Sequence, residues 1–391
     1  MIKRQLELKI KDQLTKFPVV AITGPRQSGK TTLAKILSPD YKYFNLEDIS
    51  TKTLASSDPV SFINSIADKA IIDEIQKLPE LLSQIQVKVD ESKKMGQFVI
   101  TGSESLLLSE KISQSLAGRV ANNVLLPLSY EELKKSGKEL KNIDSQILRG
   151  FYPRIYSTNM TFSEFFPEYV NTYVEKDVRS LKNIGSLSLF EKFLQLLAGR
   201  AGQLLNLTSL ANDVGVSHNT IESWVSVLEA SYIIFRLKPY YKNLGKRVIK
   251  SPKVYFHDTG LLCYLLNIGS VDILKSHYAM GSIFENLIVN EVNKYIYNNK
   301  LRSKLYFYRD SNGNEVDLLI DSGAMILGIE IKASQTYSVD FLKGLRSFDT
   351  SNSGSIEFKA FITYRGKHNQ EINNIRLRNF VSLHEVLREI D

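Results

Sequence analysis

The chain has 391 residues, of which 43% are hydrophobic and 24% charged, a composition typical of globular proteins. Its apolar runs fall short of the ~20 residues that span a membrane, and the charged sequence after Met1-Ile2-Lys3-Arg4 is unlike a signal-peptide core, so we expect a cytoplasmic protein without a membrane partner. The single cysteine, Cys263, excludes internal disulfides and cysteine-rich zinc sites. The length predicts two to three domains, and the net charge of +8 favours polyanionic partners.

A glycine-bearing loop follows the apolar strand expected at 19–22. It contains Gly24, Pro25, Arg26, Gln27, Ser28, Gly29, Lys30, Thr31 and Thr32, and an apolar helical run follows at 33–37. The two glycines permit a tight turn whose N–H groups face phosphate oxygens. In this spacing Lys30 would reach the β- and γ-phosphates of ATP, and the Thr31 hydroxyl would ligate Mg²⁺. A glycine turn before an ordinary helix is the alternative, but it leaves the full spacing unexplained.

Two acids end the next buried strand, which is expected at 70–72. They are Asp73 and Glu74, in the order typical of a Walker B segment. Asp73 would hold Mg²⁺ through water, and Glu74 would polarise the attacking water. A strand that merely ends in two carboxylates is the alternative.

A further strand at 97–103 ends in Ser103, which could contact the γ-phosphate or the water if the sheet is parallel. Arg119 follows, in the run 116–120. In an oligomeric ATPase, an arginine at this position could contact the nucleotide of a neighbouring subunit. A solvated surface arginine is the equal alternative.

The region from about 150 to 200 is expected to be helical. Apolar residues at three- and four-residue spacing over 165–178 predict a helix packed on the ATPase core. Glu175 and Asp177 would either reach the nucleotide or belong to a salt-bridged helix face.

Residues 207–228 have the pattern of a helix-turn-helix. A helix, a glycine turn and the N-cap Ser217 precede a second helix, and strands at 232–237 and 253–256 would supply the wing of a winged helix. The segment between them lacks acids and is basic and aromatic, with Arg236, Lys238, Tyr240, Tyr241, Lys242, Lys246, Arg247, Lys250 and Lys253. This suits phosphate contacts and stacking. The second helix, however, carries Glu222 and no Lys or Arg, and winged helices also serve as ATPase lids or protein contacts.

The last 110 residues predict an αβββαβ order. A helix at 282–298 carries Glu285, strands are expected at 305–309, 315–321 and 324–332, and a helix near 339–348 and a strand at 358–364 follow. Asp317, Glu330 and Lys332 lie on neighbouring strands. With Glu285 they resemble the PD-(D/E)xK nuclease signature, in which the three acids would hold Mg²⁺ and Lys332 would activate water. A nuclease-like domain retained only as an interaction platform is the alternative.

The succession GPRQSGKTT, AIIDEIQ, FVITGS, SLAGRV and PLSYEEL resembles the AAA+-type ATPases of archaea and bacteria that carry a C-terminal region of unknown function. The stretches GFYPRIY, YVNTYVEKDV, YFHDTGLL, GSIFENLIVNEV and EVDLLI…GIEIKAS match that region as well. The resemblance implies that Lys30 and Thr31 contact nucleotide and metal, that Asp73 and Glu74 are the Walker B pair, that Ser103 is the sensor, and that Arg119 is the candidate finger. Many AAA+ proteins have Asn at the sensor position, where this chain has Ser103 followed by Glu104.

We therefore expect an α/β fold with four regions: a P-loop ATPase domain (1–135), a helical connection (136–203), a winged-helix-like domain (204–279) and a nuclease-like domain (280–391). The leading hypothesis is a homo-oligomeric ATPase that uses ATP and Mg²⁺ to work on DNA. The rival is an ATP-dependent switch that binds a protein partner and whose nuclease-like domain is inert. A nucleotide kinase would need an acceptor pocket and lid arginines, which the sequence does not locate.

Overall fold

The computed structural model describes residues 2–103, 112, 115–174, 186–240, 251–352, 356–372 and 374–390. Glu104, Glu175, Asp177 and the basic segment 241–250, which the sequence analysis singled out, lie outside these residues. Within the described residues, no helix combines the length and the apolar composition needed to cross a bilayer.

The N-terminal part is a parallel sheet with helices on both faces. Its five strands, in the spatial order β2-β3-β4-β1-β5, are β1 (Val19–Thr23), β2 (Lys42–Asn45), β3 (Ala70–Asp73), β4 (Phe98–Gly102) and β5 (Val120–Val124). The surrounding helices are α1 (Glu7–Leu14), α2 (Lys30–Leu37), α3 (Ile49–Ser57), α4 (Pro59–Asn64) and α5 (Leu81–Ser92), with a 3₁₀ turn η1 (Ile75–Lys77) after β3.

Each face of this sheet has its own apolar core. Val20 and Ile22 pack with α1 and α2, whereas Val19 and Ala21 face the core formed with α4 and α5. Strands β1, β3 and β4 are buried at every position, which is why they appear in the sequence as short continuous apolar runs. Because all the pairings are parallel, the carboxyl ends of β1, β3 and β4 meet at one edge.

The middle of the chain is mostly helical. Its elements are α7 (Tyr130–Lys135), α8 (Ile143–Arg149), α9 (Pro153–Ser157), α10 (Phe162–Tyr169), a π-helical turn (Val170–Val174), α12 (Leu187–Ala198), α13 (Leu207–Val214), α14 (His218–Ala230), α15 (Thr259–Leu265) and α16 (Val271–Ser276). Gly215, with φ of 92°, ends α13, and the Ser217 hydroxyl accepts the Thr220 N–H at 3.1 Å to begin α14. This is the helix-turn-helix arrangement that the sequence predicts.

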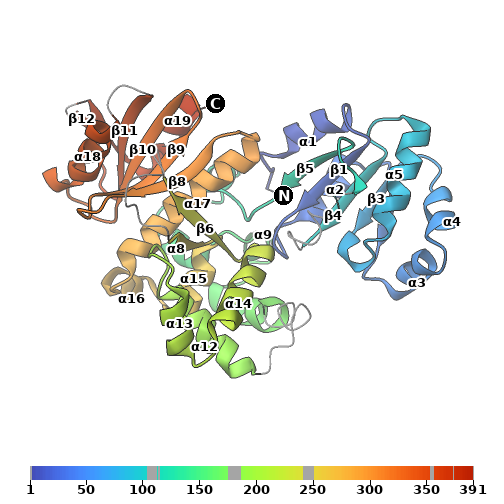
Figure 1. The fold of residues 1–391 in the computed structure, drawn as a ribbon, viewed down its shortest axis with the longest axis horizontal. Helices are drawn as coiled ribbons and strands as arrows, with labels where there is room; N and C mark the ends of the chain where they lie inside the picture. Colours follow the sequence, from blue (N-terminus) through green and yellow to red (C-terminus); the bar gives the residue numbers. More distant parts are fainter. Residues whose placement is uncertain are drawn as a thin grey trace.

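The C-terminal part begins with the long helix α17 (Met280–Asn299). Its other elements are β8 (Lys304–Arg309), β9 (Glu315–Asp321), β10 (Met325–Lys332), η3 (Val339–Leu342), α18 (Lys343–Asn352), β11 (Glu357–Tyr364), β12 (Gln370–Ile372), β13 (Ile375–Asn379), η4 (Phe380–Ser382), α19 (Leu383–Leu387) and η5 (Arg388–Ile390). Figure 1 shows this part and the five-stranded sheet at opposite ends of the molecule, with α12–α14 forming a third lobe. The predicted α/β fold, with a parallel P-loop sheet and a further α/β domain, is confirmed.

The two strands expected to form a wing also extend the C-terminal sheet. β6 (Ile234–Pro239) pairs antiparallel with β7 (Lys253–Phe256) and parallel with β8, giving the strand order β12-β13-β11-β10-β9-β8-β6-β7. A two-stranded hairpin alone is marginally stable, and pairing with β8 adds ladder hydrogen bonds and burial. The expected boundary at 279/280 therefore falls inside one continuous sheet.

The end of β7 leads into a buried ionisable pair. His257 is buried among Phe235 and Asn290, and burial together with the positive charge of Lys294 lowers its pKa to about 3. Asp258 accepts the N–H groups of Leu261 at 2.9 Å and Phe151 at 2.7 Å, while burial raises its pKa to about 6.

The two groups give opposite pH dependences of stability. An unfolded histidine has a pKa of about 6.5, so the stability contributed by neutral His257 is full above that pH and is lost as the pH falls towards 3, by about 1.4 kcal/mol per pH unit. The raised pKa of Asp258 contributes stability that is lost as the pH rises from about 4 through 6.

We expect the difference in unfolding free energy between the wild type and His257→Gln to shrink between about pH 6 and 4. Urea unfolding at several pH values measures it, and a constant difference would contradict a buried neutral His257.

Candidate functional site

The loop after β1 curls around the Lys30 ammonium. Gly24 has φ of 146°, and a Cβ atom there would lie 2.2 Å from the Leu125 carbonyl oxygen, so only glycine fits. Gly29, with φ of 93°, opens α2. Lys30 is buried and donates to the carbonyl oxygens of Gly24 at 3.0 Å and Pro25 at 2.9 Å. The Ser28 Oγ atom is buried without a hydrogen-bond partner among the described residues, as expected of a donor that serves a ligand.

The Asp73 carboxylate accepts hydrogen bonds from three hydroxyl groups at the edge of the sheet. Thr31 Oγ1 lies 2.9 Å from Oδ2 and 3.1 Å from Oδ1, Tyr43 donates to Oδ2 at 2.7 Å, and Thr101 donates to Oδ1. Burial and the Asp73 carboxylate raise the pKa of Tyr43. A carboxylate beside a threonine hydroxyl offers the oxygen ligands that Mg²⁺ prefers, so these residues fit the metal. Tyr43 and Thr101 were not singled out from the sequence.

Glu74 is oriented by two neighbouring side chains. Its backbone has φ of 58°, a left-handed conformation that costs a non-glycine residue about 1–3 kcal/mol. Ser103 Oγ donates to Glu74 Oε2 at 2.7 Å, and the Gln76 amide donates to Ser103 Oγ at 3.0 Å and also to Glu74. The sequence predicted Ser103 at this site but missed Gln76, although Gln76 lies only two residues after Glu74.

Arg119 lies away from this site. It immediately precedes β5, and Val120 pairs with Val19, so it stands at the amino edge of the sheet, opposite the loop. Its guanidinium makes a two-pronged ion pair with Asp90 of α5, with Nη2 at 2.8 Å from Oδ2. Contact with the nucleotide of a neighbouring subunit stays a prediction.

A cavity of about 660 Å³ lies beside the loop. The N-terminal segment, the loop with the start of α2, and the segment from Leu128 to Ser157 line it, with Gly29, Thr32 and Tyr156 among the lining residues. Arg4 holds these three parts together. Its buried guanidinium donates to the carbonyl oxygens of Ser28 at 2.7 Å and Leu126 at 2.6 Å and to Glu132 at 3.1 Å.

The structure also brings together the residues of the C-terminal signature. Lys332 Nζ lies 2.5 Å from Glu330 Oε1 and 3.7 Å from Asp317 Oδ2, and Asp317 Oδ2 accepts the Ile331 N–H at 2.8 Å. Burial raises the pKa of Glu285 to about 7 against the opposing charge of Lys253, and burial with the charge of Asp317 raises the pKa of Glu330 to about 8.

Glu285 has partners that the sequence analysis missed. Its Oε1 atom accepts from Lys253 at 2.9 Å and from Tyr255 at 2.6 Å. Across the described part of the chain, no group of three or more His, Cys, Asp or Glu side chains is placed to hold a metal ion. The Mg²⁺ expected at Glu285, Asp317 and Glu330 therefore does not fit this arrangement.

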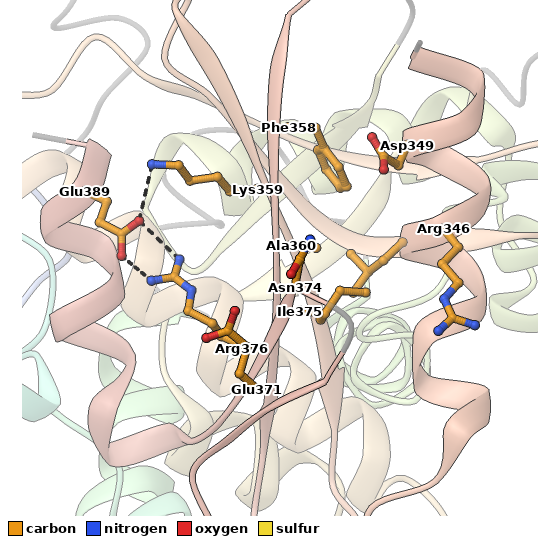
Figure 2. A pocket seen from close by; sticks show the side chains of 11 residues that line it. Arg346, Asp349, Phe358, Lys359, Ala360, Glu371, Asn374, Ile375, Arg376 and Glu389 are labelled. Atoms are coloured by element: carbon orange, nitrogen blue, oxygen red, sulfur yellow. Dashed lines mark hydrogen bonds and ion pairs between the residues drawn. The ribbon is translucent and has the colours of Figure 1, made fainter. Parts of the chain in front are cut away.

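Another cavity, of about 530 Å³, lies at the start of β11 and β13 (Figure 2). None of the residues predicted to be functional lines it. Glu389 accepts from Arg376 and lies 3.7 Å from Lys359, so much of the charge around this cavity is compensated within the chain.

Three family models match the chain. An AAA domain matches residues 16–134, a domain of unknown function (DUF8612) matches residues 140–272, and another domain of unknown function (DUF4143) matches residues 280–385. An uncharacterized protein of Mycobacterium tuberculosis is 29% identical over 371 residues, which cover 94% of this chain and 80% of the relative. An uncharacterized protein of Methanocaldococcus jannaschii is 25% identical over 355 residues, which cover 82% of this chain and 75% of the relative.

Among solved structures, a Walker-type ATPase of Pyrococcus abyssi aligns with a TM-score of 0.41 and 14% identity over 68% of this chain and 96% of its own. AMPPCP-bound DnaA from Aquifex aeolicus aligns with a TM-score of 0.29 and 13% identity over 57% of this chain and 85% of its own. These likenesses are weak, so the assignment rests on the AAA match and on the geometry of the loop. Together they support a P-loop ATPase domain over residues 16–134.

Proposed function

We propose that this protein binds ATP at residues 24–32, hydrolyses it with Glu74 as the general base, and couples turnover to work on DNA. The observation that carries the hydrolytic step is the network of Glu74, Ser103 and Gln76 beside Asp73. A general base must be held by its neighbours towards the reacting water, and the hydrogen bonds from Ser103 and Gln76 to Glu74 would serve this purpose.

The arrangement supports a division of labour among the site residues. Thr31 and Asp73 would hold Mg²⁺, which supplies charge neutralisation at the phosphates. Lys30 would exchange the carbonyl oxygens of Gly24 and Pro25 for phosphate oxygens, and Glu74 would accept the proton of the attacking water. The cavity between the N-terminal segment and Tyr156 has the size and the mixed lining suited to the nucleobase.

Two substitutions test the hydrolytic step. Lys30→Ala should abolish ATP binding and turnover, because the buried ammonium would be the positive charge that contacts the phosphates. Glu74→Gln should keep ATP binding but lower kcat by about 10²-fold or more, since general-base catalysis contributes on that scale. Calorimetric binding and steady-state turnover measure the two effects. Lys52→Ala on the surface of α3 is the matched control, and an unchanged kcat in Glu74→Gln would refute the assigned base.

The coupling to DNA is proposed on a direct bond between the helix-turn-helix region and the loop. The Tyr232 hydroxyl shares a buried hydrogen bond of 3.0 Å with Thr23 Oγ1, and Thr23 immediately precedes Gly24. Tyr232 closes α14 in a left-handed conformation, with φ of 55° and its N–H bonded to the Glu229 carbonyl at 3.0 Å. The left-handed conformation destabilises a bulky residue by about 1–2 kcal/mol, whereas glycine adopts it readily. The hydrogen bond of the Tyr232 side chain to Thr23 offsets part of this free energy.

Tyr232→Phe tests this coupling. The variant keeps the ring and loses a hydrogen bond worth about 1 kcal/mol, so we expect stimulation of ATP turnover by DNA to fall about fivefold while the fold is kept. Turnover is measured with single-stranded, duplex and branched DNA at low and moderate salt. Tyr278→Phe, at a side chain that is 81% exposed, is the control. If none of these forms of DNA changes the rate of ATP hydrolysis by the wild type, the proposed action on DNA is refuted.

A protein-binding switch is the second candidate function. It is favoured because two basic residues of the β6–β7 hairpin are compensated within the chain: Arg236 lies 2.5 Å from Glu229, and Lys253 is paired with Glu285. Association with a protein that is insensitive to salt, without DNA affinity at low salt, would select this candidate. DNA cleavage is not part of either proposal, because the C-terminal carboxylates do not fit a metal.

A further inference from the structure

One lysine reaches the C-terminal carboxylates from the hairpin strand β7. Lys253 is 3% exposed, and its Nζ atom lies 2.9 Å from Glu285 Oε1 and 2.5 Å from Glu315 Oε1. The Tyr255 hydroxyl, two residues further along β7, donates to the same Glu285 oxygen at 2.6 Å. Helix α17 and strand β9 are thus bound to β7 through one buried ammonium.

The cluster is nearly balanced in charge by its own side chains. Its acids are Glu285, Glu315, Asp317 and Glu330, and its cations are Lys253, Lys332 and Arg309, whose Nη1 atom lies 3.5 Å from Glu315 Oε2. A buried carboxylate is tolerated only when it is paired or bonded to a metal. In this cluster the carboxylates are paired with lysine and arginine side chains, so their burial does not require a metal.

Each of the three predicted metal ligands has one carboxylate oxygen engaged within the chain. Mg²⁺ prefers octahedral coordination by oxygens, of which carboxylates commonly supply one or two. Glu285 Oε1 is bonded to Lys253 and Tyr255, Asp317 Oδ2 to the Ile331 N–H, and Glu330 Oε1 to Lys332. Glu330 Oε2, by contrast, is buried without a hydrogen-bond partner among the described residues. A divalent cation would therefore have to displace Lys253 from Glu285 and Lys332 from Glu330.

We propose that the Lys253 ammonium takes the place of a divalent cation in this cluster. With its three N–H donors it can satisfy several carboxylates at once, but it brings a single positive charge and cannot activate a water molecule as a metal does. The cluster is therefore a metal-free joint that fixes the β6–β7 hairpin to the C-terminal sheet. Removing the lysine leaves Glu285 without its cation and Glu315 with Arg309 alone, which opens the cluster to a metal.

Binding of Mn²⁺, followed by electron paramagnetic resonance on the full chain without nucleotide, tests the proposal. The wild type and Asp317→Asn should bind Mn²⁺ equally weakly. Lys253→Met, which keeps most of the length of the side chain without its charge, should bind one Mn²⁺ at least about tenfold more tightly, and the double variant Lys253→Met/Asp317→Asn should lose that gain. ATP turnover does not enter this measurement, so its outcome is independent of the proposed function.

Each result decides the question. Tight Mn²⁺ binding by the wild type that is lost in Asp317→Asn would overturn the proposal, because the cluster would then hold a metal beside Lys253. A folded Lys253→Met that gains no Mn²⁺ would overturn the role of the lysine. If Lys253→Met does not fold, the unfolding temperatures of the wild type and Asp317→Asn are measured with and without excess Mn²⁺. An equal change of the two unfolding temperatures supports the proposal, and an increase in the wild type alone refutes it.

Discussion

The Asp73 carboxylate is the point on which the nucleotide site depends. It stands where the carboxyl ends of three parallel strands meet, and it accepts hydrogen bonds from Thr31 of the loop, Tyr43 of β2 and Thr101 of β4. A carboxylate at a sheet edge without such donors would be solvated and free to turn. Here three elements fix it, so the loop and the Asp73 carboxylate have defined positions relative to one another before any ligand binds.

Buried cations perform the same task between parts of the chain that are far apart in sequence. Arg4 joins the loop to Glu132, and Lys294 of α17 donates to Glu291 at 2.9 Å and to the Leu128 carbonyl at 2.8 Å. Lys253 joins β7 to α17 and β9. Buried ion pairs add little net stability compared with apolar packing, but breaking one partner costs about 3–5 kcal/mol. These cations fix the relative positions of the segments that they join, because hydrogen bonds and ion pairs are directional whereas apolar contacts are not.

What the sequence could predict follows from the range of the interactions involved. The loop 24–32, the acids at the end of β3 and the strands around Asp317 and Glu330 are encoded by neighbouring residues, and the expected strands are present at these positions. Strand β5 was not predicted, because two consecutive asparagines interrupt its apolar residues and leave a weak pattern. The pairing of β6 with β8, the bond between Tyr232 and Thr23, and the ion pairs of Lys253 and Arg119 join residues 29 to 209 positions apart, or strands from different regions, and no local pattern encodes them.

The hairpin β6–β7 is held at both of its ends by groups that belong to the two candidate sites. Just before β6, Tyr232 is bonded to the residue that precedes the nucleotide loop, and at the start of β7, Lys253 is locked among the C-terminal carboxylates. Leu237 and Lys253 are paired across the hairpin, so the two strands cannot shift independently. The proposed coupling therefore rests on a strand pair that is bonded to the residue before the nucleotide loop near one end and to the C-terminal sheet near the other.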